Sequence, residues 1–143
     1  MKEGSRANAL LVELLLVIFF FMISAAILVQ VFADAKLKSR TAHATNASML
    51  ETQNVAEDLY AAKDPNAVLA AYGFTAQDDS NWVLEKDGYY LKVTLREEET
   101  DGGVLKTYDV SGIEKKHNGS GEETEQTLLT LPSTRYIPKE VSP

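Results

Sequence analysis

Cysteine is absent from this sequence, so no disulfide bond, thiolate metal site or cysteine nucleophile contributes to its fold or function. Histidine occurs only twice, and the spacing of His43 and His117 matches no metal-binding motif. No serine, lysine or pair of acids stands in a pattern typical of nucleophilic or general acid–base catalysis. The sequence therefore predicts that the protein is not an enzyme and has no catalytic residue, metal ligand or cofactor.

Charge is missing from a long segment near the start of the chain. From Leu14 to Ala33 there is no Asp, Glu, Lys or Arg, and only Ser24 and Gln30 are clearly polar. About twenty helical residues rise roughly 30 Å, which is the thickness of the hydrocarbon core of a bilayer. An apolar segment in lipid must also be helical, because its backbone polar groups find no partner outside the segment. The sequence therefore predicts a transmembrane helix over residues 9–33, with the lipid bilayer as a partner.

Two other interpretations of this apolar run are open. A cleaved secretory signal has an apolar region of about 7–15 residues, which is shorter than this run, although the small residues in Phe32–Ala35 would suit a signal peptidase. A buried core helix would need a large apolar domain around it. The rest of the chain is too small and too polar to provide one.

The net charge of −7 arises entirely beyond the apolar run. An acidic soluble part argues against nucleic acid as a partner. Basic residues flank the run on both sides, with Lys2 and Arg6 before it and Lys36, Lys38 and Arg40 after it. The distribution of positive charge therefore does not decide which end of the helix faces the cytoplasm.

Glycine and proline are both missing from Asp34 to Lys63, where good helix formers are frequent. The helix is therefore expected to continue beyond the membrane over residues 34–63 and to end at Asp64-Pro65, because proline cannot continue the hydrogen-bond ladder. Apolar residues recur along it at every seventh position: Leu28, Ala35, Ala42, Met49 and Ala56. This narrow row either covers the soluble domain or pairs with another chain.

Residues 64–131 predict a short helix followed by an antiparallel β-meander. Asp64-Pro65 is suited to begin a helix and Gly73 to end it. Apolar and polar residues alternate from Tyr89 to Glu98, as they do in a half-buried strand between two glycine-containing turns. The expected strands are 81–85, 89–98, 104–113 and 127–131. Three prolines over residues 132–143 predict an irregular tail.

The predicted fold class is thus α+β. A long N-terminal helix, transmembrane in its first half, is expected to pack on a small C-terminal antiparallel sheet, because a sheet of three or four strands needs a helix to cover its apolar face. The expected core combines the Met49–Leu59 part of the helix with nine sheet residues: Trp82, Leu84, Leu91, Val93, Leu95, Tyr108, Val110, Leu129 and Leu131.

One carboxylate interrupts the beginning of the apolar segment, in the stretch ALLVELLLVIFF over residues 9–20. An ionised carboxylate in hydrocarbon costs several kcal/mol unless it is paired, so Glu13 is a candidate functional residue. The alternative is that Glu13 lies at the headgroup boundary, where its negative charge suits the N-terminal end of a helix. These residues alone leave both interpretations open.

The segment ALLVELLLVIFFFMISAAILVQVF resembles the N-terminal segment of type IV pilins and type II secretion pseudopilins. In that family a short basic leader and a peptidase site precede an apolar helix whose fifth mature residue is glutamate. The pattern Leu11-Val12-Glu13-Leu14-Leu15 is similar to this segment, whereas the rest of the chain resembles the family in layout only. Within the family, the chain looks most like small pilin-like proteins of Gram-positive clostridial bacteria.

The resemblance implies a role for individual residues. Glu13 would neutralise the free amino terminus of a neighbouring subunit, and residues 1–8 would be a leader that a prepilin peptidase removes between Asn8 and Ala9. The implied partners are other pilin-like subunits, contacted through the N-terminal helix, and an assembly platform. The resemblance also implies a single-pass protein of the cell membrane, with a cytoplasmic N-terminus and an extracellular C-terminal domain.

Two functions therefore follow from the sequence. The first is that of a pilin-like or pseudopilin-like subunit, with a structural and assembly role in a type IV filament or a type II secretion-type assembly. The alternative is a bitopic membrane anchor that presents a small binding domain outside any filament.

Overall fold

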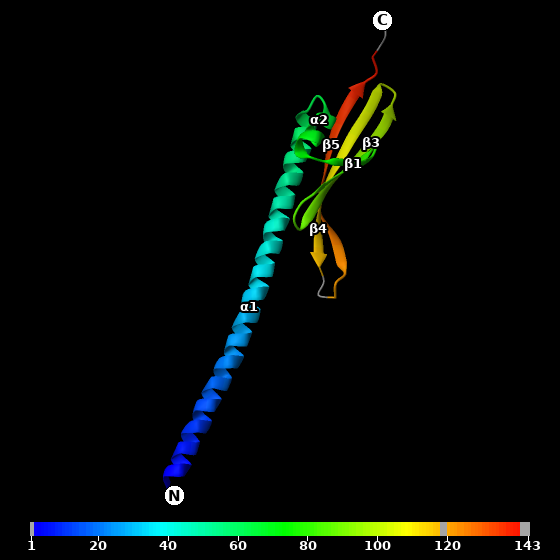
Figure 1. Ribbon diagram of the computed structural model, residues 1–143. Coiled ribbons are helices and arrows are strands. Elements are labelled where there is room, and N and C mark those ends of the chain that lie inside the picture. The colour runs from blue at the N-terminus through cyan, green and yellow to red at the C-terminus, as the bar shows by residue number, and fades with distance from the viewer. Residues whose placement is uncertain (1, 118–119, 141–143) are drawn as a thin grey trace. The chain divides into compact units, whose positions relative to one another are not determined.

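The computed structural model describes residues 2–117 and 120–140, whose helices and strands are shown in Figure 1. Helix α1 spans Lys2–Ala61 and helix α2 spans Pro65–Tyr72. The strands are β1 (Thr75–Asp78), β2 (Asn81–Glu85), β3 (Tyr89–Thr100), β4 (Gly103–His117) and β5 (Glu123–Pro138). Met1 of the expected leader and residues 141–143 of the expected tail lie outside the described residues.

Helix α1 begins earlier than expected, because Lys2–Asn8 is already helical and the leader-like segment is not a separate element within the described residues. The chain divides into two compact units between Arg40 and Thr41. The boundary expected after Ala33 marks the end of the apolar run, whereas packing against the sheet begins only beyond Arg40. Helix α1 therefore contributes to both units.

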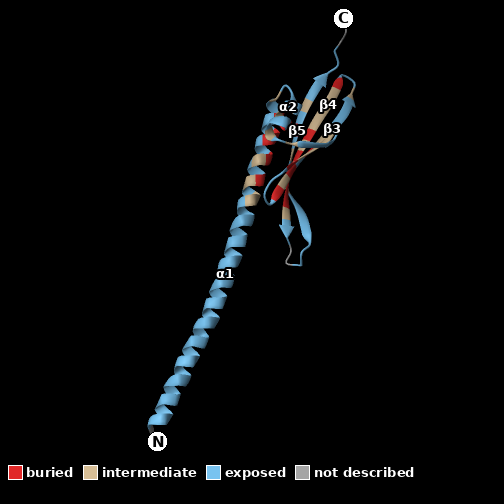
Figure 2. Ribbon diagram, viewed as in Figure 1, coloured by how far each residue is buried: buried red, intermediate tan, exposed pale blue. Residues whose placement is uncertain are grey.

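In the first unit, the described side chains of α1 are all exposed (Figure 2). They include the large apolar residues from Leu10 to Phe32, such as Phe21 at 76% exposure. Among the described residues, α1 is the one helix that is long and apolar enough to cross a membrane. An apolar surface of this size requires an apolar environment, which a bilayer or other helices can provide.

In the second unit, the five strands form one antiparallel sheet in the order β1-β2-β3-β4-β5, so each strand pairs with its neighbours in sequence. The Thr41–Ala61 part of α1 lies along one face of the sheet, and α2 lies beside the end of α1 (Figure 1). The predicted α+β class, with the long helix packed on an antiparallel sheet, is therefore confirmed.

Two segments outside the expected strands belong to strands in the structure. Thr75–Asp78 forms β1 at one edge of the sheet, and an analysis of apolar alternation did not find it because its four residues are exposed and only Ala76 is apolar. The expectation of an irregular tail is wrong up to Pro138, because β5 continues through residues 132–138. Proline is tolerated there because β5 is an edge strand. On an edge strand, every second backbone N–H points away from the neighbouring strand, and proline at such a position removes no hydrogen bond from the sheet.

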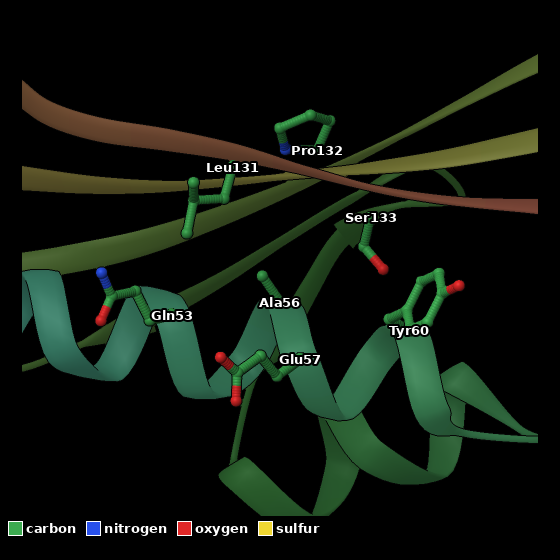
Figure 3. Close-up of a pocket in the computed structure, with 7 residues that line it drawn as sticks. All are labelled: Gln53, Ala56, Glu57, Tyr60, Leu131, Pro132 and Ser133. Atoms are coloured by element: carbon green, nitrogen blue, oxygen red, sulfur yellow. The ribbon is translucent and has the colours of Figure 1, made fainter.

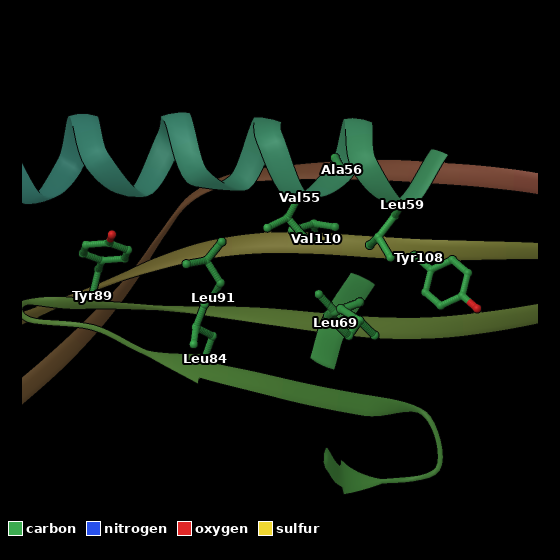
Figure 4. Packing of buried hydrophobic residues seen from close by; sticks show 10 residues of the cluster. Val55, Ala56, Leu59, Leu69, Leu84, Tyr89, Leu91, Tyr108 and Val110 are labelled. Carbon is green, nitrogen blue, oxygen red and sulfur yellow. The ribbon is translucent and has the colours of Figure 1, made fainter. Parts of the chain in front are cut away.

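The core lies between α1, α2 and the sheet (Figure 4). Five of the expected sheet residues are buried, and Trp82, Leu95 and Leu131 are half-buried beside them. Leu129 is also half-buried but lies outside this cluster. The buried members are Val55, Ala56, Leu59, Leu69, Leu84, Tyr89, Leu91, Val93, Tyr108 and Val110.

The helix face that covers the sheet differs from the expected seven-residue row. Ala42 is exposed, Met49 is 37% exposed, and only Ala56 of the row is buried in the second unit. The covering face consists instead of Ser48, Thr52, Val55, Ala56 and Leu59. Its spacing of three and four residues is that of one face of a straight α-helix, whereas a seven-residue row drifts slowly around such a helix.

The short helix α2 has the expected ends. The Asp64 carboxylate accepts hydrogen bonds from the backbone N–H groups of Asn66 (3.1 Å) and Ala67 (3.4 Å). Gly73 ends the helix at a φ of 87°, which is in the left-handed region that glycine adopts without strain. These ends place Leu69 in the core.

Candidate functional site

Glu13 lies among exposed apolar side chains in the first unit. Its neighbours in sequence, Val12 and Leu14, are 61% and 62% exposed. None of the hydrogen bonds or ion pairs formed among residues 2–117 and 120–140 includes Glu13, so Arg6 is not its partner within this part of the chain. The carboxylate is therefore available to a group outside the chain. Asn8 and Ala9 precede it on the same exposed helix.

The second unit contains an open groove between α1 and β5, with a volume of about 510 Å³ (Figure 3). Ala56 and Leu131 form an apolar part of its lining, and Leu131 and Ser133 point toward α1. The groove is lined by Gln53, Ala56, Glu57, Tyr60, Leu131, Pro132 and Ser133. The Glu57 side chain is exposed and takes part in none of the ion pairs formed among the described residues. The lining therefore combines apolar side chains with one carboxylate, and it offers no nucleophile with an adjacent base.

Helix α1 lies very close to the sheet at Gly112, in β4. A Cβ atom at this position would lie 2.5 Å from Ser48 Oγ and 2.6 Å from Thr52 Oγ1. Both α1 side chains are fully buried, and Thr52 Oγ1 donates a hydrogen bond to the Ser48 carbonyl oxygen at 2.6 Å. Ser48 Oγ has no hydrogen-bond partner among the described residues. The distance between α1 and the sheet is therefore set by two small side chains on the helix and by the absence of a side chain at Gly112 on the strand.

Polar side chains join α1 to the sheet beside this close approach. Thr45 Oγ1 donates a hydrogen bond to the buried carboxylate of Glu114 at 3.1 Å. The Tyr89 hydroxyl donates to the Glu51 carboxylate at 2.7 Å, and Lys86 Nζ lies 3.3 Å from the same carboxylate. These contacts fix the rotation of α1 about its axis, because a helix turned by one residue would lose both hydrogen bonds.

The Tyr89–Glu51 contact predicts a loss of stability at alkaline pH. Burial, with the hydrogen bond to Glu51, raises the pKa of Tyr89 from 10.0 to about 12. The contribution of Tyr89 is fully present below pH 10 and is lost between about pH 10 and 12, because in this range the unfolded state releases a proton that the folded state retains. Tyr89→Phe should therefore make the free energy of unfolding fall less steeply over this range.

The measurement is denaturant unfolding of the full chain in detergent micelles, followed by the fluorescence of Trp82, the single tryptophan. Tyr72 is a second contributor, since its hydrogen bond to Asp58 at 2.5 Å raises its pKa to about 12. The Tyr72→Phe variant should show a similar reduction in slope. An unchanged slope in Tyr89→Phe would contradict the prediction.

Neither the two histidines singled out in the sequence nor the charged run over residues 96–101 forms a site among the described residues. His43 is exposed on α1, and the only described contact of His117 with an acid is with Glu123, at 3.6 Å. Within the described part of the chain, no three His, Cys, Asp or Glu residues lie close enough together to hold a metal ion. The charged run Arg96–Asp101 covers the end of the β3–β4 hairpin, where Arg96 pairs with Asp109 at 2.6 Å.

The close approach at Gly112 and the α1–β5 groove were not anticipated from the sequence. A glycine inside a strand is a signal of close backbone approach, and it was available in the segment VSGI. The groove had no such signal, because its two sides lie far apart in sequence and β5 was expected to end before Pro132.

Comparison with known proteins adds no family assignment. No protein-family model matches this chain. No curated protein and no solved structure matches it either.

Proposed function

We propose that this protein is a pilin-like or pseudopilin-like membrane subunit. In this proposal the apolar run of α1 holds the chain in the membrane until it packs against the same run in other subunits. The Glu13 carboxylate then pairs with the free amino terminus of a neighbouring subunit. The protein has a structural role in a type IV filament or a type II secretion-type assembly, with its N-terminus in the cytoplasm and its C-terminal domain outside the cell.

The observation that carries the proposal is the position of Glu13. It is a carboxylate with no partner among the described residues, and it lies on an otherwise apolar, exposed helix surface. Burial of a single charge in a bundle of apolar helices is strongly unfavourable, whereas burial of a carboxylate with an ammonium group is tolerated when their geometry is good. Pairing between subunits would therefore also fix their relative position along the helix axis.

A second candidate function is supported by the residue before the expected cleavage site. Pilin leaders normally end in glycine, but Asn8 precedes Ala9 here, and cleavage after Gly4 would make Glu13 the ninth mature residue. Without cleavage at Ala9, the amine that Glu13 requires would not be formed. The protein would then be a bitopic membrane anchor that presents the α+β domain for binding.

The mature amino terminus separates these two functions. We expect mass spectrometry of the protein isolated from membranes of a cell with a prepilin peptidase to show a chain that begins at Ala9. The same protein from a cell without the peptidase, as the control, should retain residues 1–8. An intact leader in both cells would overturn the pilin-like proposal and favour the membrane anchor.

A further inference from the structure

Beyond the apolar run, basic and acidic residues occupy different segments of α1. The segment Asp34–Arg40 carries three basic residues and one acid, and all its side chains are exposed. The segment Thr41–Ala62 carries no Lys or Arg and three acids, Glu51, Glu57 and Asp58. Each copy of the helix is therefore basic just beyond the apolar run and acidic further along.

Among the contacts of the described residues, Glu57 is the one of these three acids that takes part in no ion pair and no hydrogen bond. Glu51 is 3.3 Å from Lys86, and Asp58 accepts a hydrogen bond from Tyr72. Glu57 lines the α1–β5 groove, which the apolar side chains of Ala56 and Leu131 also line. The groove therefore offers one carboxylate beside an apolar surface.

The basic segment has the complementary character. Lys36 and Arg40 are one helical turn apart and share a face of α1. Leu37 lies at the side of this face and is 63% exposed. An apolar side chain with neighbouring cations is complementary in chemistry to a groove that is lined by apolar side chains and one carboxylate.

We propose that the α1–β5 groove binds the Lys36–Arg40 segment of a second copy of this chain, with Arg40 beside Glu57 and Leu37 against the apolar lining. This inference rests on the proposed function, because it assigns a second contact to the same assembly. Two parallel helices in register would place like charges side by side, which is unfavourable. A staggered pair places the basic segment of one copy beside the acidic segment of the other.

The stagger also determines how many neighbours each subunit has. Glu13 and Ala9 are one helical turn apart, so pairing of the carboxylate with the amine requires a small axial shift between two copies. Arg40 and Glu57 are several turns apart, so their pairing requires a much larger shift. One neighbour cannot satisfy both contacts. Each α1 therefore meets at least two different neighbours, as in a helical array and not in a simple dimer.

Cross-linking between single cysteines tests this arrangement, because the natural chain contains no cysteine. A Leu37→Cys chain and a Gln53→Cys chain with a different tag are expressed together, and their membranes are oxidised. We expect a disulfide-linked pair that carries both tags. Asn54→Cys is the matched control for Gln53→Cys, because it is the next exposed residue on α1 but does not line the groove. It should give a markedly lower yield.

The charges are tested in the same cysteine pair. Adding Glu57→Arg to the Gln53→Cys chain should lower the cross-linked yield about fivefold. Adding Arg40→Glu to the Leu37→Cys chain as well should restore it. Equal yields for Gln53→Cys and Asn54→Cys, or no effect of either charge reversal, would overturn the proposed groove contact.

Co-purification of the two tags without oxidation separates this inference from the proposed function. If the tags co-purify in a manner that depends on Glu13 while the Leu37–Gln53 cross-link is absent, the groove contact is overturned and the subunit function stands. If the tags do not co-purify at all, both proposals are overturned.

Discussion

Glu13→Ala should leave the protein in the membrane but remove it from assemblies of this chain. Alanine makes the apolar run of α1 more hydrophobic, so insertion is not impaired. The amino terminus of the neighbouring subunit would lose its partner on entering the bundle. An uncompensated buried charge costs about 3–5 kcal/mol, which corresponds to a loss of at least a hundredfold in the equilibrium for incorporation.

Two further substitutions distinguish charge from size at this position. Glu13→Gln keeps the length of the side chain and its ability to accept a hydrogen bond but removes the negative charge, so we expect a loss close to that of alanine. Glu13→Asp keeps the charge but shortens the side chain, so we expect partial incorporation. The measurement is the fraction of tagged variant that co-purifies with a wild-type chain carrying another tag.

Gln30→Ala is the matched control for these variants, because Gln30 is also an exposed polar residue of the apolar run. It should incorporate as the wild type does, and all variants should remain in the membrane fraction after an alkaline wash. Wild-type incorporation of Glu13→Ala would contradict the pilin-like proposal, and the chain would then be described better as a membrane anchor.

The sequence is informative about α1 and the central strands because one physical signal dominates each of them. Absence of charge from Leu14 to Ala33 requires an apolar environment, and absence of glycine and proline up to Lys63 permits a continuous helix. Alternation in Tyr89–Glu98 predicts β3 with its buried face, since Tyr89, Leu91 and Val93 are all in the core. Such local signals do not depend on the rest of the fold.

Other features depend on contacts between distant segments and were not predictable in this way. Pro132 indicates a loop unless its strand is known to lie at the edge of the sheet. The covering face of α1 begins with Ser48 and Thr52, and such polar residues are not expected in a buried face. They are buried because Gly112 brings the strand close to the helix, and this pairing is visible only in three dimensions.

The candidate functional residues also differ in whether a local sequence signal identifies them. Glu13 was recognisable because a charge in an apolar run is anomalous on its own. Glu57 is one acid among many, and its position becomes informative only when it is known to line the same groove as Leu131. The contacts of Glu51 with Tyr89 and of Thr45 with Glu114 likewise join residues that no local pattern connects.

Gly112→Val should unfold or strongly destabilise the α+β domain. Even the Cβ atom of the new side chain would lie 2.5 Å from Ser48 Oγ, and the two methyl groups would extend further into α1. Overpacking in a core typically costs 1–3 kcal/mol, and we expect about 3 kcal/mol here because the side chains of Ser48 and Thr52, which the valine would meet, are both fully buried. The measurement is thermal unfolding of the full chain in micelles, followed by Trp82 fluorescence.

Ser111→Val is the matched control, because Ser111 is adjacent to Gly112 on β4 but its hydroxyl lies within hydrogen-bond distance of Thr130, at 2.9 Å, on the opposite face of the sheet. Valine is favourable in strands, so this substitution should change stability by less than about 1 kcal/mol. An equal effect of both substitutions would show that a general property of β4, and not the approach of α1, determines the response to valine.

A rescue experiment identifies the atoms responsible. Gly112→Ala alone should be destabilising, since its Cβ atom would meet the side-chain oxygens of Ser48 and Thr52. Ser48→Ala alone should be neutral or slightly stabilising, because Ser48 Oγ is buried without a hydrogen-bond partner among the described residues and alanine is the best helix former. Combining Gly112→Ala with Ser48→Ala and Thr52→Ala removes both obstructing oxygens, so the triple variant should be more stable than Gly112→Ala. If it were less stable, the distance between α1 and β4 would be set by contacts other than those at Gly112.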